Sequence, residues 1–189
     1  MPSPNILVLR LSSLGDVVLT APVYRNLKAH WPEARVSVLV KPQFAPVLAG
    51  NPCVDEVLVY RGFRSALRDI RSRGFTHLLD LHATGRTILL RRLSGVANVA
   101  SYRKHALARR FYVLFRWASP ALSTHTLERY LDALSAWGVP VVHRALRLGD
   151  YGAAEKPRPA PAAQRVLIMQ TSFLGDALLT VPLARRVKE

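Results

Sequence analysis

The sequence predicts an α/β fold in which a parallel β-sheet is covered by helices on both faces. Half of the 189 residues are hydrophobic, which is enough to build a substantial core. Short apolar runs of strand length also alternate with longer stretches of helical period. Regular alternation of this kind is typical of parallel sheets whose strands are joined by right-handed helical crossovers.

Four apolar runs have the length and composition of buried strands. They occupy residues 5–10, 36–40, 56–60 and 76–81. Ligands of open parallel sheets bind beyond the carboxyl ends of the strands. The residues after the first and fourth strands, 12–16 and 82–86, are therefore the first candidates for a functional site.

Three stretches have the pattern of amphipathic helices. The first covers residues 16–30 and follows the first strand. The second, 64–73, places Leu67 and Ile70 on one face. The third, 124–137, opens with threonines suited to a helix cap and stops at Gly138.

The chain is predicted to contain one domain, a linker and the start of a repeat. Residues 1–150 form the α/β domain, and three prolines in residues 151–164 predict an extended linker. Residues 5–28 and 165–188 align at an offset of 160 with 10 identities in 24 positions, including the pattern SxLGDxxLTxP. Residues 165–189 are thus expected to be the first strand and helix of a second copy, so we expect a fragment of a longer tandem protein.

Composition narrows the classes of function. No apolar stretch reaches the ~18–20 residues that a bilayer span requires, and the N-terminus does not resemble a signal peptide, which predicts a cytoplasmic protein. The single cysteine, Cys53, is expected to be a small buried hydrophobe. Without a Cys/His cluster, the sequence predicts no metal site.

Positive charge is concentrated in one part of the chain. Lysines and arginines number 27 against 12 acidic residues, giving a formal charge of +15, yet no acidic residue lies between Asp80 and Glu128. The basic residues of this window are Arg86, Arg91, Arg92, Arg103, Lys104, Arg109, Arg110 and Arg116. Such a local field suits phosphates, nucleic acid or an anionic membrane surface. For any single one of these side chains, a solvated surface position is a simpler interpretation than a role in binding an anion.

The repeated loop carries the polar groups most suited to chemistry. Ser12 and Ser13 supply hydroxyls, Gly15 permits unusual dihedral angles or close approach of a ligand, and Asp16 stands at the predicted helix start. One reading of Asp16 is an ordinary helix cap. The other is a general base that removes a proton from an acceptor hydroxyl, which points to group transfer. The loop matches neither a phosphate-binding GKS/GKT loop nor a GxGxxG fingerprint.

The order and spacing of several segments resemble one known family. Four segments within residues 5–140 carry the resemblance: ILVLRLSSLGDVVLTAPVYRNLK, NPCVDEVLVY, FTHLLDLHATGRTILLRRLSG and HTLERYLDALSAWGV. Together they resemble the N-terminal half of glycosyltransferase family 9, the ADP-heptose:lipopolysaccharide heptosyltransferases. The resemblance implies a GT-B architecture of two Rossmann-like domains, of which this is the N-terminal one. It also implies metal-independent, inverting transfer of heptose from ADP-heptose to the inner core of lipopolysaccharide.

The resemblance also implies roles for particular residues. Asp16 would be the general base, and Asp176 its equivalent in the second copy, with Ser172 and Gly175 in the corresponding loop. Ser12, Ser13, Gly15, His82 and Arg86 would bind substrate. His82 departs from the family, which more often has glutamine there, so a polar lining role is expected for it.

The implied partners are anionic. They are a phosphorylated, carboxylate-bearing inner-core and lipid A acceptor, an ADP-sugar donor, and the anionic inner leaflet on which the protein would be peripheral. No resident cofactor is implied. The donor-binding domain of GT-B enzymes has no counterpart in the sequence, so we expect residues 1–189 alone to show little or no transfer.

Two other readings stay open. The first is a noncatalytic module of the same fold that binds the acceptor or an anionic membrane. The second is a nucleic-acid-binding protein, which the charge alone permits. No helix-turn-helix, RRM or zinc-finger pattern supports it, so nucleic acid is not expected as a partner.

Overall fold

The computed structural model describes residues 3–102 and 125–146. Contacts divide the chain into Met1–Tyr151 and Gly152–Glu189, and every described residue lies in the first unit. The predicted linker and second copy, with Ser172, Gly175 and Asp176, lie outside the described residues. So do the basic residues of the acid-free window from Arg103 onward.

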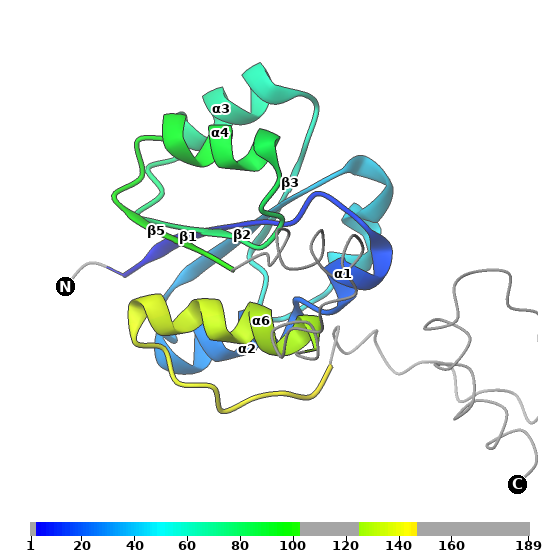
Figure 1. The fold of residues 1–189 in the computed structure, drawn as a ribbon, viewed down its shortest axis with the longest axis vertical. Helices are drawn as coiled ribbons and strands as arrows, with labels where there is room; N and C mark the ends of the chain where they lie inside the picture. Colours follow the sequence, from blue (N-terminus) through cyan, green and yellow to red (C-terminus); the bar gives the residue numbers. More distant parts are fainter. Residues whose placement is uncertain (1–2, 103–124, 147–189) are drawn as a thin grey trace, which may run out of the picture. The chain divides into compact units, whose positions relative to one another are not determined.

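A five-stranded parallel sheet forms the centre of the domain (Figure 1). Its strands are β1 Asn5–Leu9, β2 Arg35–Val40, β3 Glu56–Val59, β4 His77–Asp80 and β5 Asn98–Ser101. The strand order is β3-β2-β1-β4-β5. The four predicted strands are confirmed to within one residue at each end. The short edge strand β5 was not predicted, because only one of its four residues, Ala100, is buried and it has no apolar run.

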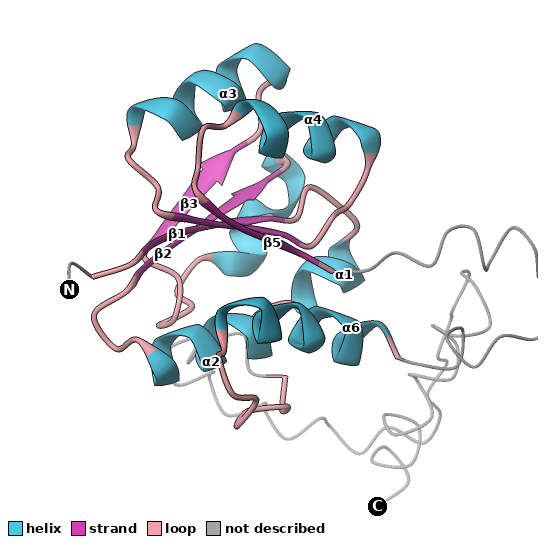
Figure 2. Cartoon of the chain, turned by 60° about the vertical axis from the view of Figure 1, so that its left-hand side comes forward, coloured by secondary structure: helices cyan, strands magenta, loops and turns pink. Residues whose placement is uncertain are grey.

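Helices cover both faces of this sheet (Figure 2). The α-helices are α1 Leu14–Val18, α2 Ala21–His30, α3 Phe63–Ser72, α4 Gly85–Leu93 and α6 Thr126–Asp132, and the 3-10 helices are η1 Pro42–Leu48 and η3 Ala133–Trp137. Helices α3 and α4 lie on one face, and α2 and α6 on the other. None of these helices has both the length and the apolar character needed to cross a bilayer.

The predicted single helix over residues 16–30 is wrong. The structure has two helices, α1 and α2, separated at Leu19 and Thr20. Pro22 lies in the first turn of α2, where its missing N–H is tolerated, whereas a continuous helix would place its ring against the carbonyl of Val18. The LTxP pattern, residues 19–22, therefore marks the break between two helices.

Two further helix predictions need correction. The helix predicted over 124–137 is α6 followed by the 3-10 helix η3, and it ends as predicted at Gly138, whose φ of 67° is left-handed. Helix α4 was not predicted, because its sequence GRTILLRRL begins with a glycine and buries only Thr87 and Leu90. Thr84 caps its first turn.

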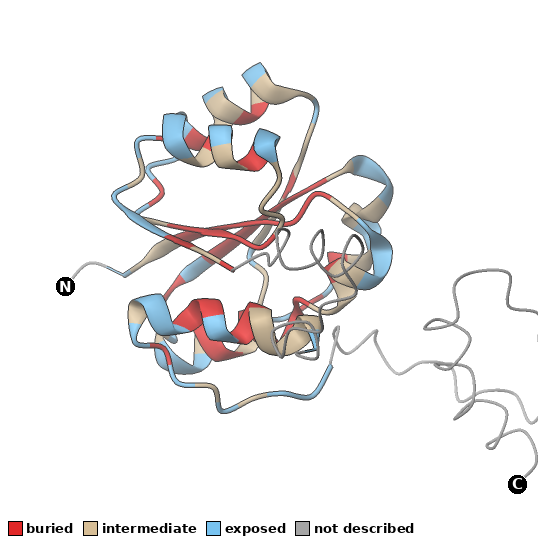
Figure 3. Cartoon of the chain, in the orientation of Figure 1, coloured by how far each residue is buried: buried red, intermediate tan, exposed pale blue. Residues whose placement is uncertain are grey.

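Side chains of β1 alternate between two hydrophobic cores, as the period of a strand requires. Ile6 and Val8 pack in the cluster shared with α2 and α6, whereas Leu7 and Leu9 pack in the cluster shared with α3 and α4. Buried backbone accordingly runs through the sheet between the two layers of helices (Figure 3). The alternation directs the next residue, Arg10, to the α2 and α6 side. A charged side chain is thereby placed at the end of the central strand.

Asn26 fastens the segment after η3 to the rest of the domain. It is fully buried in α2, and its amide oxygen accepts from the backbone N–H groups of Val142 and His143 at 2.8 and 2.9 Å. Its amide nitrogen donates to the carbonyl oxygen of His143 at 2.7 Å. Three backbone groups far away in the sequence depend on this one side chain.

We expect Asn26→Ala to lower the free energy of unfolding by about 2–3 kcal/mol, because it empties the space of a fully buried side chain and removes the partner of three part-buried backbone groups. Urea unfolding followed by circular dichroism measures the difference. Asn98→Ala is the matched control, since Asn98 is exposed and donates one side-chain hydrogen bond, to Thr76; it should cost under about 1 kcal/mol. Equal losses in both variants would contradict this role of Asn26.

Candidate functional site

The candidate site lies where the order of strands reverses. β1 pairs with β2 on one side and β4 on the other, so the loops after β1 and β4 leave the sheet next to each other. Ligands of open α/β sheets bind at such a switch point. The predicted site residues of the described domain lie in these two loops or at the start of the helices α1 and α4 that follow them.

Arg10 joins the two loops and α6. Its side chain is buried, with a residue exposure of 6%. One terminal nitrogen donates to the carbonyl oxygen of Leu81 after β4, and the other forms an ion pair with Oδ2 of Asp16. The guanidinium carbon lies 5.3 Å from the ring centroid of Tyr130 in α6. This contact is a cation–π interaction.

The two carboxylate oxygens of Asp16 have different surroundings. Oδ2 accepts hydrogen bonds from the hydroxyl and the backbone N–H of Ser13, at 2.9 and 3.2 Å, in addition to the Arg10 contact. Oδ1 accepts one long hydrogen bond, 3.3 Å, from the hydroxyl of Tyr130. The side chain is 32% exposed. Oδ1 is therefore the oxygen that is available to a substrate.

The surroundings of Asp16 favour its ionised form. Partial burial acts to raise its pKa, but the charge of Arg10 and the hydrogen bonds from Ser13 and Arg10 outweigh burial, so the pKa lies below its ordinary value. Burial raises the pKa of Tyr130, which keeps its hydroxyl protonated as a donor. At neutral pH the cluster holds a carboxylate with one oxygen fixed and the other able to accept a proton.

The geometry agrees with both interpretations of Asp16, as a helix cap and as a general base. The contacts with Ser13 form a capping arrangement at the start of α1, as the cap reading requires. Those contacts use Oδ2 and leave Oδ1 for a general base. Because α1 is separate from α2, the cap serves a helix of only five residues.

Of the two reasons predicted for Gly15, unusual dihedral angles and close approach of a ligand, the structure contradicts the first. The φ of Gly15 is not positive, so the backbone there needs no unusual dihedral angle. A Cβ at this position would meet no atom within 4 Å among the described residues. Gly15 is exposed, as is Ser13, while Ser12 is partly exposed. Open space beside Asp16 is consistent with close approach of a ligand.

Asp80 shapes the loop that carries His82. The Asp80 side chain is fully buried, and its Oδ1 accepts from the backbone N–H groups of His82 and Ala83 at 3.0 and 2.9 Å. Ala83 has a positive φ of 46°, which the turn imposes. His82 is partly buried on the same loop whose Leu81 carbonyl binds Arg10. The structure thus brings His82 to the correct edge of the sheet.

Arg86 is exposed in the first turn of α4. Its guanidinium carbon lies 5.7 Å from the ring centroid of Tyr60, which follows β3. This contact directs Arg86 toward the α3 side of the domain. Arg86 therefore shares the ligand edge with Asp16 without joining the Arg10 cluster.

Sequence reasoning missed Arg10 and Tyr130. Arg10 was identifiable from its charge, because it follows directly on a buried strand. Tyr130 lies on the apolar stripe of α6, is 0% exposed and stacks edge-on against Tyr102 at 5.2 Å, so its pattern matches any core aromatic. Within residues 3–102 and 125–146, no group of His, Cys, Asp and Glu side chains is arranged to hold a metal ion.

The sequence is similar to known proteins over about two thirds of its length. Lipopolysaccharide heptosyltransferase 3 of Escherichia coli K12 is 23% identical over 140 residues, which is 66% of this chain and 40% of that protein. A second E. coli protein of the same name is 23% identical over 138 residues. No protein-family model matches the chain. The chain spans about two fifths of the length of these relatives.

Solved structures show the same fold. E. coli heptosyltransferase WaaC with ADP aligns with a TM-score of 0.59 and 17% identity over 76% of this chain and 50% of that one. A glycosyl transferase of family 9 from Veillonella parvula aligns with a TM-score of 0.57 and 21% identity over 72% and 42%. E. coli ADP-heptose heptosyltransferase II gives 0.57 and 20% over 76% and 46%.

The described domain is thus a Rossmann-like α/β domain of the kind found in GT-B glycosyltransferases, and the predicted fold class is confirmed. The predicted resemblance is confirmed as well: in sequence and fold the chain is similar to the heptosyltransferases of glycosyltransferase family 9.

We expect Arg10→Gln to raise the pKa of Asp16, because burial then acts without the opposing charge. The lowered pKa of Asp16 stabilises the folded state above the unfolded-state pKa, and this contribution is lost as pH falls through the folded-state value. The variant should therefore lose about 3 kcal/mol at pH 7 and less near pH 2. NMR titration of the Asp16 carboxyl carbon and urea unfolding measure both effects.

Arg144→Gln is the control for that experiment. Arg144 forms an exposed ion pair with Glu128, so its loss should leave the titration of Asp16 unchanged. A pKa of Asp16 that is the same in Arg10→Gln and in the unmodified protein would show that Arg10 does not set it.

Proposed function

We propose that this chain provides the acceptor-binding domain of a glycosyltransferase of lipopolysaccharide core biosynthesis, with Asp16 as the general base. One observation carries the proposal: Asp16 is held as a carboxylate at the switch point of the sheet, with Oδ2 fixed by Arg10 and Ser13 and Oδ1 bound only by one long hydrogen bond from Tyr130. The similarity to heptosyltransferases supports the reaction class.

In the proposed reaction, Oδ1 of Asp16 accepts the proton of an acceptor hydroxyl while the hydroxyl oxygen attacks the anomeric carbon of an ADP-sugar. The bond from that carbon to the ADP oxygen breaks, and ADP leaves with the electron pair. Attack from the face opposite ADP inverts the anomeric centre. ADP-heptose is the proposed donor, because one similar structure holds ADP and another an ADP-heptose analogue.

The acceptor in this proposal is a phosphorylated, carboxylate-bearing glycolipid of the inner core. Ser12, Ser13 and His82 lie on the two loops of the site, and Arg86 begins the neighbouring helix. Hydroxyl, imidazole and guanidinium groups can all donate hydrogen bonds to such an anion. No described atom beyond its chain neighbours and its own helix backbone lies within 4 Å of where a Cβ of residue 15 would stand, which supports approach of the acceptor from this side of the loop.

The second copy of the motif is a weaker candidate for the base. Asp176 aligns with Asp16, but Gln170 replaces Arg10 and Phe173 replaces Ser13. The groups that hold Asp16 as an anion are therefore absent from that sequence. We propose Asp16 as the acting base and Asp176 as its sequence counterpart.

A noncatalytic acceptor-binding module of the same fold is the second candidate. It is favoured by the capping contacts of Ser13, which give Asp16 a structural task without catalysis. In that case Asp16 would contribute to stability and leave the transfer rate unchanged. Kinetics of an Asp16 variant separates the two functions.

We expect Asp16→Asn to lower transfer of heptose from ADP-heptose by about 10²–10⁴-fold, the usual contribution of a general base. The assay uses the native polypeptide that carries residues 1–189 and an acceptor lipopolysaccharide that lacks heptose. Acceptor affinity should change only a few-fold, because Asn keeps the shape of the side chain.

Glu33→Gln is the charge-matched control, since Glu33 is exposed and lies between α2 and β2. Its transfer rate should match that of the unmodified protein. Normal turnover by Asp16→Asn, with Asp176→Asn added to remove the second copy, would show that neither aspartate is the base and would favour the noncatalytic module.

A further inference from the structure

The outer surface of α3 and α4 is strongly cationic. The two helices carry six arginines and one carboxylate, that of Asp69. The arginines are Arg64, Arg68, Arg71, Arg86, Arg91 and Arg92. None of them forms an ion pair with another residue in the described part of the chain, although ion pairs neutralise several arginines elsewhere in it. This surface is called the α3–α4 face below.

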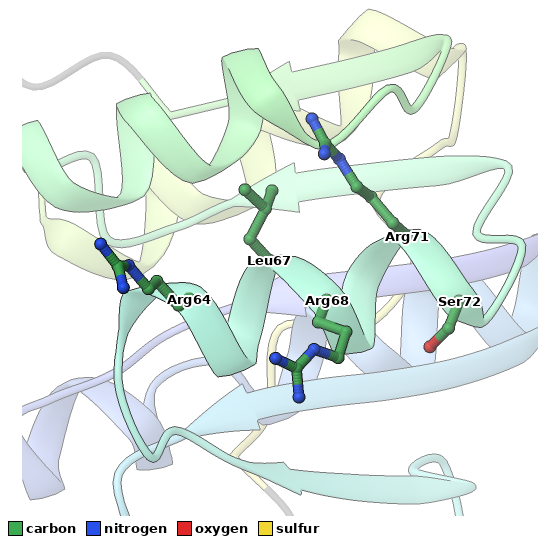
Figure 4. A pocket seen from close by; sticks show the side chains of 5 residues that line it. All are labelled: Arg64, Leu67, Arg68, Arg71 and Ser72. Carbon is green, nitrogen blue, oxygen red and sulfur yellow. The ribbon is translucent and has the colours of Figure 1, made fainter.

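The arginines of α3 follow one stripe at the spacing i, i+4, i+7. Arg64, Arg68 and Arg71 project around Leu67 and, together with Ser72, line an open hollow of about 440 Å³ (Figure 4). The buried residues of α3, Ala66 and Ile70, point the other way into the core. The cationic stripe therefore faces away from the sheet.

Helix α4 adds exposed leucines to this charged surface. Leu89 is 47% exposed and Leu93 is 40% exposed, and with Arg86 they share a stripe at i, i+3 and i+7. Thr87 and Leu90 are buried beneath them. The arginines of α3 thus lie beside the exposed leucines of α4 on one outer surface, and basic residues next to exposed apolar ones are found in segments that lie at a bilayer interface.

Arg71 links α3 to α4, so that their outer sides form one surface. Its Nε and one terminal nitrogen donate to the carbonyl oxygen of Leu93 at 3.0 and 2.7 Å, which fastens the end of α4 to α3. Helices α3 and α4 lie side by side in both overall views (Figures 1 and 2). A flat partner can therefore contact both stripes at once.

We propose that the α3–α4 face binds the anionic phospholipid surface of a bilayer, with the arginines at the headgroups and Leu89 and Leu93 at the edge of the acyl region. Charge complementarity selects an anionic partner, and the leucines favour a bilayer over nucleic acid. Stacking on bases uses aromatic side chains, and neither helix carries an exposed one. The inference deepens the proposed function, on which it rests for its biological context, because a glycolipid acceptor resides in a membrane.

Co-sedimentation with vesicles tests this surface in the 189-residue chain. Binding is measured to vesicles of phosphatidylethanolamine and phosphatidylglycerol and to vesicles of phosphatidylcholine alone. We expect binding to the anionic vesicles only, and a decrease with salt. Arg64→Gln combined with Arg68→Gln should lower the partition coefficient at least tenfold, since each charge at such a surface contributes about fivefold.

Arg35→Gln combined with Arg144→Gln is the matched control. It removes the same charge from exposed side chains outside the α3–α4 face, so it should change the partition coefficient less than about twofold. Leu89→Asn combined with Leu93→Asn keeps the charge and should abolish the binding that survives 0.5 M salt. This pair also tests the face independently if the arginine variant fails to fold by circular dichroism.

Three results would overturn the inference. They are equal binding to phosphatidylcholine vesicles, an equal loss in the Arg35 and Arg144 control, or displacement of the vesicles by an equal charge concentration of double-stranded DNA. Because these vesicles contain no lipopolysaccharide, the result is independent of acceptor recognition. If the chain binds acceptor glycolipid in detergent but does not bind anionic vesicles, the inference about the α3–α4 face is wrong and the proposed function stands.

Discussion

The contacts of one buried guanidinium, that of Arg10, hold the candidate site together. Burying a cation costs several kcal/mol unless its charge and its N–H groups are paired. Here the Asp16 carboxylate, the Leu81 carbonyl and the Tyr130 ring, from three separate parts of the chain, supply partners for the charge and for both terminal nitrogens, while the buried Nε–H has no hydrogen-bond partner among the described residues. The loop after β1, the loop after β4 and α6 must therefore assemble together. The geometry of Asp16 is a consequence of satisfying Arg10.

Sequence patterns predicted the strands and helices whose residues are apolar because they are buried in the core. The four predicted strands, β1 to β4, are apolar because both faces of the sheet are covered, and each appeared as a short apolar run. The elements that were missed are determined by other forces. Pro22 prevents α1 and α2 from forming one continuous helix, because its ring would clash with the preceding turn, and an apolar pattern does not record this steric effect. Strand β5 exists because Asn98–Ser101 pairs with β4, a contact between distant residues.

The same distinction applies to the site. Asp16 could be predicted because the repeated LGD pattern marks it, but its partners required three-dimensional information. Arg10 and Asp16 are the sole charged residues among the first 24, and their opposite signs were an available signal that they pair. Tyr130 is 114 positions from Asp16 and lies on an apolar stripe, so no local pattern distinguishes its hydroxyl from that of a core tyrosine. Long-range hydrogen bonds to side chains leave little trace in sequence.

The pairing with Arg10 affects the proposed chemistry in two opposing ways. It lowers the pKa of Asp16, which weakens the carboxylate as a base. It also neutralises the local charge, so that an anionic acceptor approaching Oδ1 meets an ion pair in a strongly basic protein instead of an isolated anion. A weak base cannot remove the proton of an ordinary hydroxyl in advance. In the proposed reaction, proton transfer to Asp16 would therefore accompany formation of the new glycosidic bond, when the attacking oxygen becomes far more acidic.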